Sequence, residues 1–142
     1  MRDNGPPPKR LHISRSQDGG LTWSHVRDSQ ILNPGAGADL ATLRNGHWVL
    51  AFNDTERGRH SLAVSLSTDE GETWSQPRHL EQDSSKTTSF AYPAVVQRED
   101  DTVHVVYSYH GRKSNGEAHK TIKHVRFNEG WITGPSTAGR AQ

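Results

Sequence analysis

The sequence predicts an all-β fold made of repeated four-stranded antiparallel sheets. Three observations support this prediction: an eight-residue motif occurs twice, alternating apolar and polar residues lead into both copies, and turn-forming residues separate the segments between them. Alternation with a period of two is typical of strands that bury one face. No segment shows the periodicity of a convincing helix.

The repeated motif reads Ser-x-Asp-x-Gly-x-Thr-Trp and is an Asp box. It spans residues 16–23 and 67–74, so the two copies are 51 residues apart. In such a motif the Asp accepts backbone N–H bonds in a tight turn, the Gly supplies a positive φ, and the Trp pins the turn to its sheet. We therefore expect structural roles for Asp18 and Asp69, in turns at the outer side of the sheets.

The expected strands follow the repeat in chain order. The patterns predict strands near 10–16, 38–43, 47–53, 61–67, 90–97, 102–109 and 121–127. The turn Arg44-Asn45-Gly46 is a good hairpin signal between two of them. Each Asp-box turn leads into one more strand, which completes a four-stranded unit of roughly 50 residues. The polar segment 111–120 predicts a mobile loop, and 128–131 is a degenerate Asp-box turn.

Four-stranded antiparallel units of this length are the blades of a β-propeller. We divide the chain into the end of one blade (1–30), a complete blade (31–83) and a last blade (84–142), about two and a half blades in all. Propellers have about four to eight blades, and a partial ring leaves unpaired strand edges and uncovered apolar surface. The prediction is that the other half of the propeller is missing or that copies of the chain self-associate.

Composition narrows the classes of function. A net charge of +1 gives no electrostatic reason to expect nucleic acid or an acidic membrane surface as a partner. No stretch approaches the roughly 20 apolar residues of a membrane helix. The chain has no Cys, which excludes disulfides, thiolate metal sites and a Cys nucleophile. We expect no metal and no cofactor, because the spacing of the candidate ligands matches no common zinc pattern; these are His104, His110, His119 and His124.

Together with the two Asp boxes, four segments resemble those of bacterial BNR-type members of the sialidase (neuraminidase) superfamily. They are residues 33–39, 58–62, 91–94 and 122–124. The resemblance covers nearly the whole chain and implies the C-terminal half of a six-bladed sialidase-type propeller. It implies a fragment of an exo-sialidase-like glycoside hydrolase that acts on sialoglycans or another acidic carbohydrate. Asp boxes also occur in non-hydrolytic propellers, so a carbohydrate- or protein-binding module and an inactive truncated product are the alternatives.

The resemblance also implies roles for individual residues. Family members hold the carboxylate of sialic acid with three Arg, and they use a Tyr activated by a Glu as the nucleophile. Arg2 precedes the first Asp-box strand as the second of those Arg does, and Arg59 stands in R-x-x-L where the third does, with Arg57 as a competitor. Tyr92 opens the innermost strand of the last blade, where the nucleophile lies, although Pro follows it where many sialidases have Ser. Asp39 opens the preceding innermost strand and is an acidic site candidate.

The same resemblance places the first Arg, the acid/base Asp and the Glu before Met1. A Tyr without its base is a poor nucleophile, so we expect the chain by itself to be inactive as a hydrolase. The polar, Pro-rich start is not typical of a signal peptide, and we expect Met1 to be an internal residue of a longer protein. Arg2, Arg59 and Tyr92 are expected to converge at one end of the central channel, around a space that one carboxylate fills.

Overall fold

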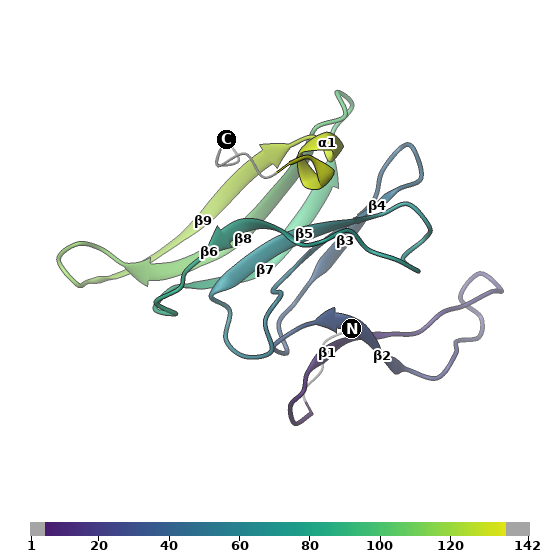
Figure 1. Cartoon of the computed structure of the whole chain (residues 1–142), viewed down its shortest axis with the longest axis horizontal. Coiled ribbons are helices and arrows are strands. Elements are labelled where there is room, and N and C mark those ends of the chain that lie inside the picture. Colours follow the sequence, from purple (N-terminus) through teal and green to yellow (C-terminus); the bar gives the residue numbers. More distant parts are fainter. Residues whose placement is uncertain (1–4, 136–142) are drawn as a thin grey trace.

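The computed structural model describes residues 5–135, which form three antiparallel sheets in chain order (Figure 1). Sheet A contains β1 (Arg10–Ile13) and β2 (Arg27–Leu32); sheet B contains β3 (Asp39–Thr42), β4 (Trp48–Phe52), β5 (Ser61–Ser67) and β6 (Arg78–Gln82); sheet C contains β7 (Ser89–Gln97), β8 (Val103–Arg112) and β9 (Ala118–Phe127). Each expected strand is present, and β2 and β6 are the additional strands that follow the Asp-box turns. The all-β prediction is confirmed.

The sequence repeat is also a repeat of strand pairing. In sheet B, Ala63 of β5 pairs with His79 of β6. In sheet A, His12 pairs with Asp28, and both residues lie 51 positions earlier in the chain. The hairpin β1–β2 therefore corresponds to β5–β6, the second half of sheet B.

Both Asp boxes close on themselves through local hydrogen bonds. Asp69 accepts from Thr73 N at 2.9 Å, from Thr73 Oγ1 at 2.5 Å and from Ser67 Oγ at 2.8 Å. Gly71 has a φ of 82°, which suits a residue without a Cβ. Asp18 makes the same three kinds of bond in the first box. The bonds from the Thr side chains, more than any other cause, lower the pKa of both carboxyls to about 2.

We expect acid to destabilise the protein through these two turns. Because the pKa of each carboxyl is lower in the folded chain than its ordinary value of 3.8, the stabilisation is present above pH 3.8 and is lost as the pH falls to about 2. The double variant Asp18→Asn/Asp69→Asn should lower Tm at neutral pH by a few degrees. It should also flatten the dependence of Tm on pH across that interval, measured by circular dichroism. Equal pH slopes for variant and parent would contradict the assignment.

Sheets B and C pack face to face through one apolar cluster. Val49 and Val64 of sheet B meet Val105 and Tyr107 of sheet C, and all four side chains are buried. Val105 and Tyr107 alternate with more exposed neighbours along β8, as the period of a strand requires. Complete burial of a side chain of this size contributes about 1.5–3 kcal/mol, so this interface holds the two sheets together. Sheet A meets sheet B through a smaller cluster centred on Leu11.

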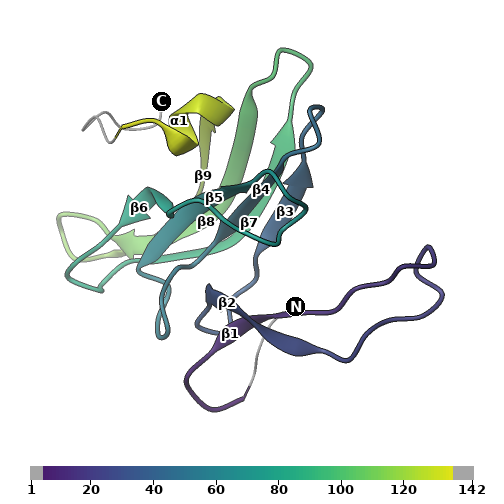
Figure 2. The same ribbon diagram turned by 45° about the vertical axis from the view of Figure 1, so that its right-hand side comes forward.

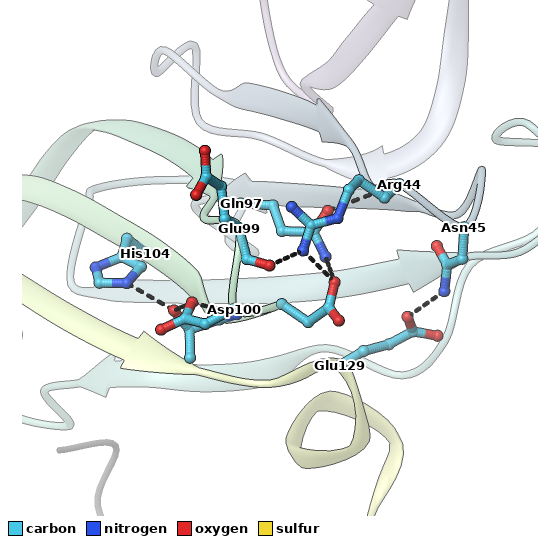
Figure 3. Close-up of polar contacts among 9 residues, drawn as sticks. Arg44, Asn45, Gln97, Glu99, Asp100, His104 and Glu129 are labelled. Atoms are coloured by element: carbon cyan, nitrogen blue, oxygen red, sulfur yellow. Dashed lines mark hydrogen bonds and ion pairs between the residues drawn. The ribbon is translucent and has the colours of Figure 1, made fainter.

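Polar contacts join the hairpin turns of sheets B and C (Figure 3). The backbone N–H of Arg44 donates to Gln97 Oε1 at 2.8 Å, and its guanidinium donates to Glu99 O and Asp101 Oδ1, each at 2.5 Å. Arg44 thus binds three groups across the inter-sheet boundary. These bonds fix the position of the β3–β4 turn against the β7–β8 turn.

The chain after β9 forms a short helix, α1 (Glu129–Thr133), where the sequence predicts a degenerate Asp-box turn. The prediction of no helix is wrong for these five residues. Asn128 caps the helix, since its side-chain oxygen accepts from Trp131 N at 2.9 Å, and Ile132 is buried against the core. Asn45 donates to the first residue of the helix, as Figure 3 shows.

The predicted mobile loop at 111–120 is a hairpin instead. β8 continues to Arg112 and β9 begins at Ala118, and the turn between them closes with Gly116 N donating to Lys113 O at 2.9 Å. Polar composition did not predict these strand ends because both strands project beyond sheet B, where polar side chains are exposed even though the backbone is paired. The turn between the two strands lies within the segment 111–120 that the sequence predicts as a loop.

The three sheets do not close into a ring within residues 5–135. The all-β sheets are consistent with blades of a partial propeller, and the blade boundaries given above stay a prediction. In this described part of the chain, no helix has the length and apolar run that crossing a membrane requires.

Candidate functional site

Tyr92 sits on an irregular part of β7. The pairing of β7 with β8 shifts register between Ala91 and Ala94, and Tyr92 has a φ of 53°. A non-glycine residue rarely adopts a positive φ, and such strain is found most often at functional positions. Ala91 and Pro93 on either side are buried, whereas 59% of Tyr92 is exposed. The strand therefore holds the Tyr92 side chain out of the core.

Arg59 lies directly against this tyrosine. Its guanidinium carbon is 5.1 Å from the centre of the Tyr92 ring, which is a cation–π contact. The backbone carbonyl of Arg59 accepts from Phe90 N at 2.7 Å. Two segments 33 positions apart in the sequence are therefore joined, the loop before β5 and the start of β7. The structure brings together two described residues for which the family resemblance implies carboxylate binding and the role of nucleophile, and these roles stay predictions.

Asn53 fixes the spacing between these two segments. It is fully buried, and its Nδ2 donates to Ser61 O at 2.6 Å and to Phe90 O at 3.0 Å. One amide group thus bridges the strand that follows Arg59 and the strand that carries Tyr92. Sequence reasoning missed this residue. The sequence feature that could have identified Asn53 is its position as a single amide residue directly after the apolar run at 48–52.

The loop before β3 contacts the tyrosine ring. A Cβ on Gly37 would lie 3.4 Å from Tyr92 Cδ1, so the glycine leaves the ring in close contact with the backbone. The side-chain oxygen of Asn33 shapes this loop by accepting from Gly35 N at 2.9 Å and from Ala36 N at 2.8 Å. Tyr92 is therefore bounded by a guanidinium and by a glycine segment.

Asp39 links sheets B and C. Its Oδ2 accepts from Val95 N at 2.8 Å, just past the irregular part of β7. β7 is an edge strand of sheet C, and this bond gives one of its backbone donors a partner. The contact gives Asp39 a role in positioning β7, and its predicted role as an acidic site residue stays a prediction. Arg2, the remaining candidate, lies outside the described residues.

A second carboxylate lies near the site. Asp54 is largely buried, its Oδ1 accepts from Ser61 Oγ at 2.6 Å, and His79 Nε2 lies 2.7 Å from its Oδ2. In a nucleophilic triad the imidazole stands between the hydroxyl and the carboxylate. Here the carboxylate stands in the middle, so the cluster does not activate the serine. It holds the start of β5 against β6.

A tyrosine–glutamate pair occurs in the core. Tyr107 donates to Glu81 Oε1 at 2.7 Å, and Lys123 pairs with the same carboxylate. Burial, together with Glu81, raises the pKa of Tyr107 well above its usual range. A raised pKa keeps the hydroxyl protonated, so Tyr107 serves packing between the sheets and is not available as a nucleophile.

The histidines do not gather around a common point. His104 Nδ1 and His124 Nε2 are 2.8 Å apart and the two rings stack, so these groups bind each other. His119 instead packs near Tyr109, with ring centroids 5.8 Å apart. Within residues 5–135 there is no cluster of three or more His, Asp or Glu that could hold a metal ion.

Comparison with known proteins identifies the type of domain. The family model of the BNR repeat-like domain matches residues 1–105. No curated protein matches the chain. Among solved structures it is similar to a polysaccharide lyase, a PL25 ulvan lyase bound to -[GlcA(1-4)Rha3S]-, with a TM-score of 0.53 and 21% identity over 74% of this chain.

The match to the lyase concerns the fold. This chain covers 27% of the lyase, about a quarter of its length, and identity this low shows shared architecture and not shared activity. The family model, in contrast, covers well over half of the chain. Together with two Asp-box turns in equivalent hairpins, it shows that this chain belongs to the BNR repeat-like domain family.

Proposed function

We propose that the chain is part of a BNR propeller that binds an acidic carbohydrate, and that Arg59 and Tyr92 recognise the carboxylate of the sugar. The observation that carries this proposal is the backbone of Tyr92. A strained φ of 53° holds a largely exposed aromatic ring beneath a guanidinium. Strain of this kind costs about 1–3 kcal/mol and persists at sites where it serves a function.

The arrangement suits a sugar acid chemically. A guanidinium that stacks through its face keeps the N–H groups around its edge for a carboxylate, which it binds in a bidentate manner. The phenol of Tyr92 adds a donor next to the same group. An exposed aromatic ring also offers an apolar surface on which a sugar ring can lie. The lyase of similar fold is bound to a glucuronate-containing polymer, which supports acidic glycans as the class.

A finer proposal names sialic acid and hydrolysis. In that case Tyr92 is the nucleophile, Arg2 and Arg59 hold the sialic acid carboxylate, and Asp39 lies beside them. The remaining catalytic groups would come from outside this chain, as the sialidase resemblance implies. The protein would then be one part of an exo-sialidase.

Binding without hydrolysis is the second candidate, and one contact favours it. Asp39 is already engaged by Val95 N at 2.8 Å. A carbohydrate-binding module needs neither a base nor an acid at Tyr92.

The proposal is tested by titrating the 142-residue chain with three sugars. These are the methyl glycoside of sialic acid, methyl glucuronide and methyl galactoside. Binding observed by NMR should be weak, and it should be restricted to the acidic sugars. Arg59→Ala should weaken it by about tenfold or more, because a charge-assisted pair is lost. Tyr92→Phe should weaken it several-fold through loss of the hydroxyl.

Arg57→Ala is the matched control, since Arg57 is an exposed arginine two positions away, and it should change the affinity less than twofold. Equal binding of galactoside, or a larger loss in Arg57→Ala than in Arg59→Ala, would disprove the assignment. Release of product from a fluorogenic sialoside is the assay for hydrolysis. No turnover is expected from this chain by itself under either one, and turnover that Tyr92→Phe abolishes would establish hydrolysis.

A further inference from the structure

Sheet C forms one end of the row of three sheets (Figure 2). One of its faces packs on sheet B through Val105 and Tyr107. The opposite face, which we call the far face, carries the side chains that alternate with these two along β8, together with their partners on β9. Residues that are paired directly across two strands share a face, so the pairing defines the members of the far face.

The far face is basic. Its five pairs along β8 and β9 run from His104–Arg126 to Arg112–Ala118, and none of them contains a carboxylate. The basic side chains among them are His104, His110, Arg112, Lys120, His124 and Arg126. All of these are exposed except His104, which is half-buried. The whole chain has a net charge of only +1, so positive charge is concentrated on this face.

The equivalent positions of sheet B are apolar. The first hairpins of sheets B and C enclose turns of equal length, which aligns the pair Val49–Leu66 of sheet B with the pair His104–Arg126 of sheet C. Val49 is 0% exposed and Leu66 is 6% exposed, and both belong to the apolar cluster that sheets B and C share. At this pair the far face of sheet C carries basic groups where sheet B makes apolar contact with its neighbour.

A sheet packed on the far face in the same way would bury Arg126 without a carboxylate partner. Within residues 5–135 neither Arg126 nor Lys120 forms an ion pair, whereas Lys123 on the opposite face of β9 pairs with Glu81. Removing an unpaired charge from water is strongly unfavourable. The far face is therefore suited to contact with water or with a negatively charged solute.

The basic side chains form two groups, one at each end of the far face. One group consists of His104, His124 and Arg126, and the other consists of His110, Arg112 and Lys120. His104 is held between two neighbours, because its Nδ1 lies 2.8 Å from His124 Nε2 and its Nε2 lies 2.9 Å from Thr102 Oγ1. The Thr102 hydroxyl in turn donates to Asp100 Oδ1 at 2.6 Å, in the turn before β8 (Figure 3).

An exposed apolar centre separates the two groups. It contains Val106, which is 41% exposed, and Ile122, which is 66% exposed. His124 and Lys120 on either side of Ile122 are four residues apart on β9, which is about 13 Å at the rise of a strand. The carboxylate of a single sugar cannot contact both groups across this distance, whereas a chain of acidic sugars can.

We propose that the far face of sheet C binds a linear acidic polysaccharide. The anionic groups of the polysaccharide pair with the basic side chains at the two ends, and a sugar ring lies on Val106 and Ile122 between them. The five pairs contain no Phe, Tyr or Trp on which nucleic-acid bases could stack, so an acidic glycan suits this surface better than single-stranded nucleic acid. The proposal goes beyond the recognition of one sugar at Arg59 and Tyr92 and does not depend on it.

Oligogalacturonate is the probe, and the same oligomer with its carboxylates methyl-esterified is the uncharged control. Added to the 142-residue chain, the acid should bind saturably and shift the NMR signals of backbone amides in β8 and β9 but not in β1. Added salt should weaken the binding, because exposed charges are screened. The double variant Lys120→Gln/Arg126→Gln should bind about tenfold more weakly. Its Tm should not change, because both side chains are exposed.

Arg27→Gln/Lys86→Gln is the matched control, because it removes the same charge from two exposed residues outside sheet C. This variant should bind oligogalacturonate as the parent does. Arg59→Ala should also leave this binding unchanged, which separates the far face from the proposed sugar site. Equal binding of the esterified oligomer, equal losses in the two double variants, loss of binding in Arg59→Ala, or tighter binding of single-stranded DNA would each overturn the proposal.

Discussion

Phe90→Ala is expected to lower the free energy of unfolding by about 3–5 kcal/mol, because it empties the centre of the interface between sheets B and C. The Phe90 side chain is buried, and its ring centroid lies 6.4 Å from that of Tyr107 and 5.9 Å from that of Tyr109. Aromatic pairs in these geometries add to the effect of burial. The loss approaches the whole stability of a small domain, about 5–15 kcal/mol.

Urea denaturation followed by Trp fluorescence measures this change. Phe90→Leu is the matched control, since it keeps most of the buried volume and should cost much less than Phe90→Ala. The phenylalanine also precedes the strained Tyr92, and its N–H donates to Arg59 O. Phe90→Ala should therefore reduce sugar binding even where the chain stays folded. A loss of stability below about 1 kcal/mol would contradict the central position of this ring in the core.

Asn53→Ala is expected to cost about 2–4 kcal/mol, because the substitution leaves two buried carbonyls without a donor. These are Ser61 O and Phe90 O, which receive bonds of 2.6 and 3.0 Å. Since these carbonyls belong to the segments that carry Arg59 and Tyr92, the variant should also weaken binding of acidic sugars. Thermal denaturation and the sugar titration measure the two effects.

Asn115→Ala is the control for Asn53→Ala. Asn115 lies in the exposed β8–β9 turn, where its side chain accepts one backbone bond, from Glu117 N. Its substitution should change stability by no more than about 0.5 kcal/mol. If the two variants lost equal stability, the bridge that Asn53 forms between sheets B and C would have no special role.

One contact of the candidate site was expected from the sequence, and the roles of its residues stay predictions. The family resemblance drew attention to Arg59 and Tyr92, and the structure places the guanidinium of one over the ring of the other. The sequence did not indicate the positive φ of Tyr92, which depends on the shifted pairing of β7 with β8. It also did not indicate Asn53, because a single buried amide has no periodic pattern.

Two segments depart from the sequence-based fold. The helix at 129–133 forms where Asn128 provides a cap and the buried Ile132 finds apolar surface on sheets B and C. The hairpin at the end of β8 forms where polar composition predicts a loop. Contacts with other parts of the chain decide the helix, whereas the hairpin closes through backbone bonds of its own turn and the pairing of β8 with β9.

The sequence by itself determined what depends on short separations along the chain. It determined the alternating strands. It also determined the two Asp boxes, because the Asp, Ser and Thr side chains of each box form hydrogen bonds within eight residues. The 51-residue repeat places both boxes in equivalent hairpins. The tertiary structure decided which distant groups meet, such as Arg59 with Tyr92 and Asp39 with Val95 N. The physical reason is that a turn closes through its own hydrogen bonds, whereas these pairs form only after two sheets have buried their apolar faces against each other.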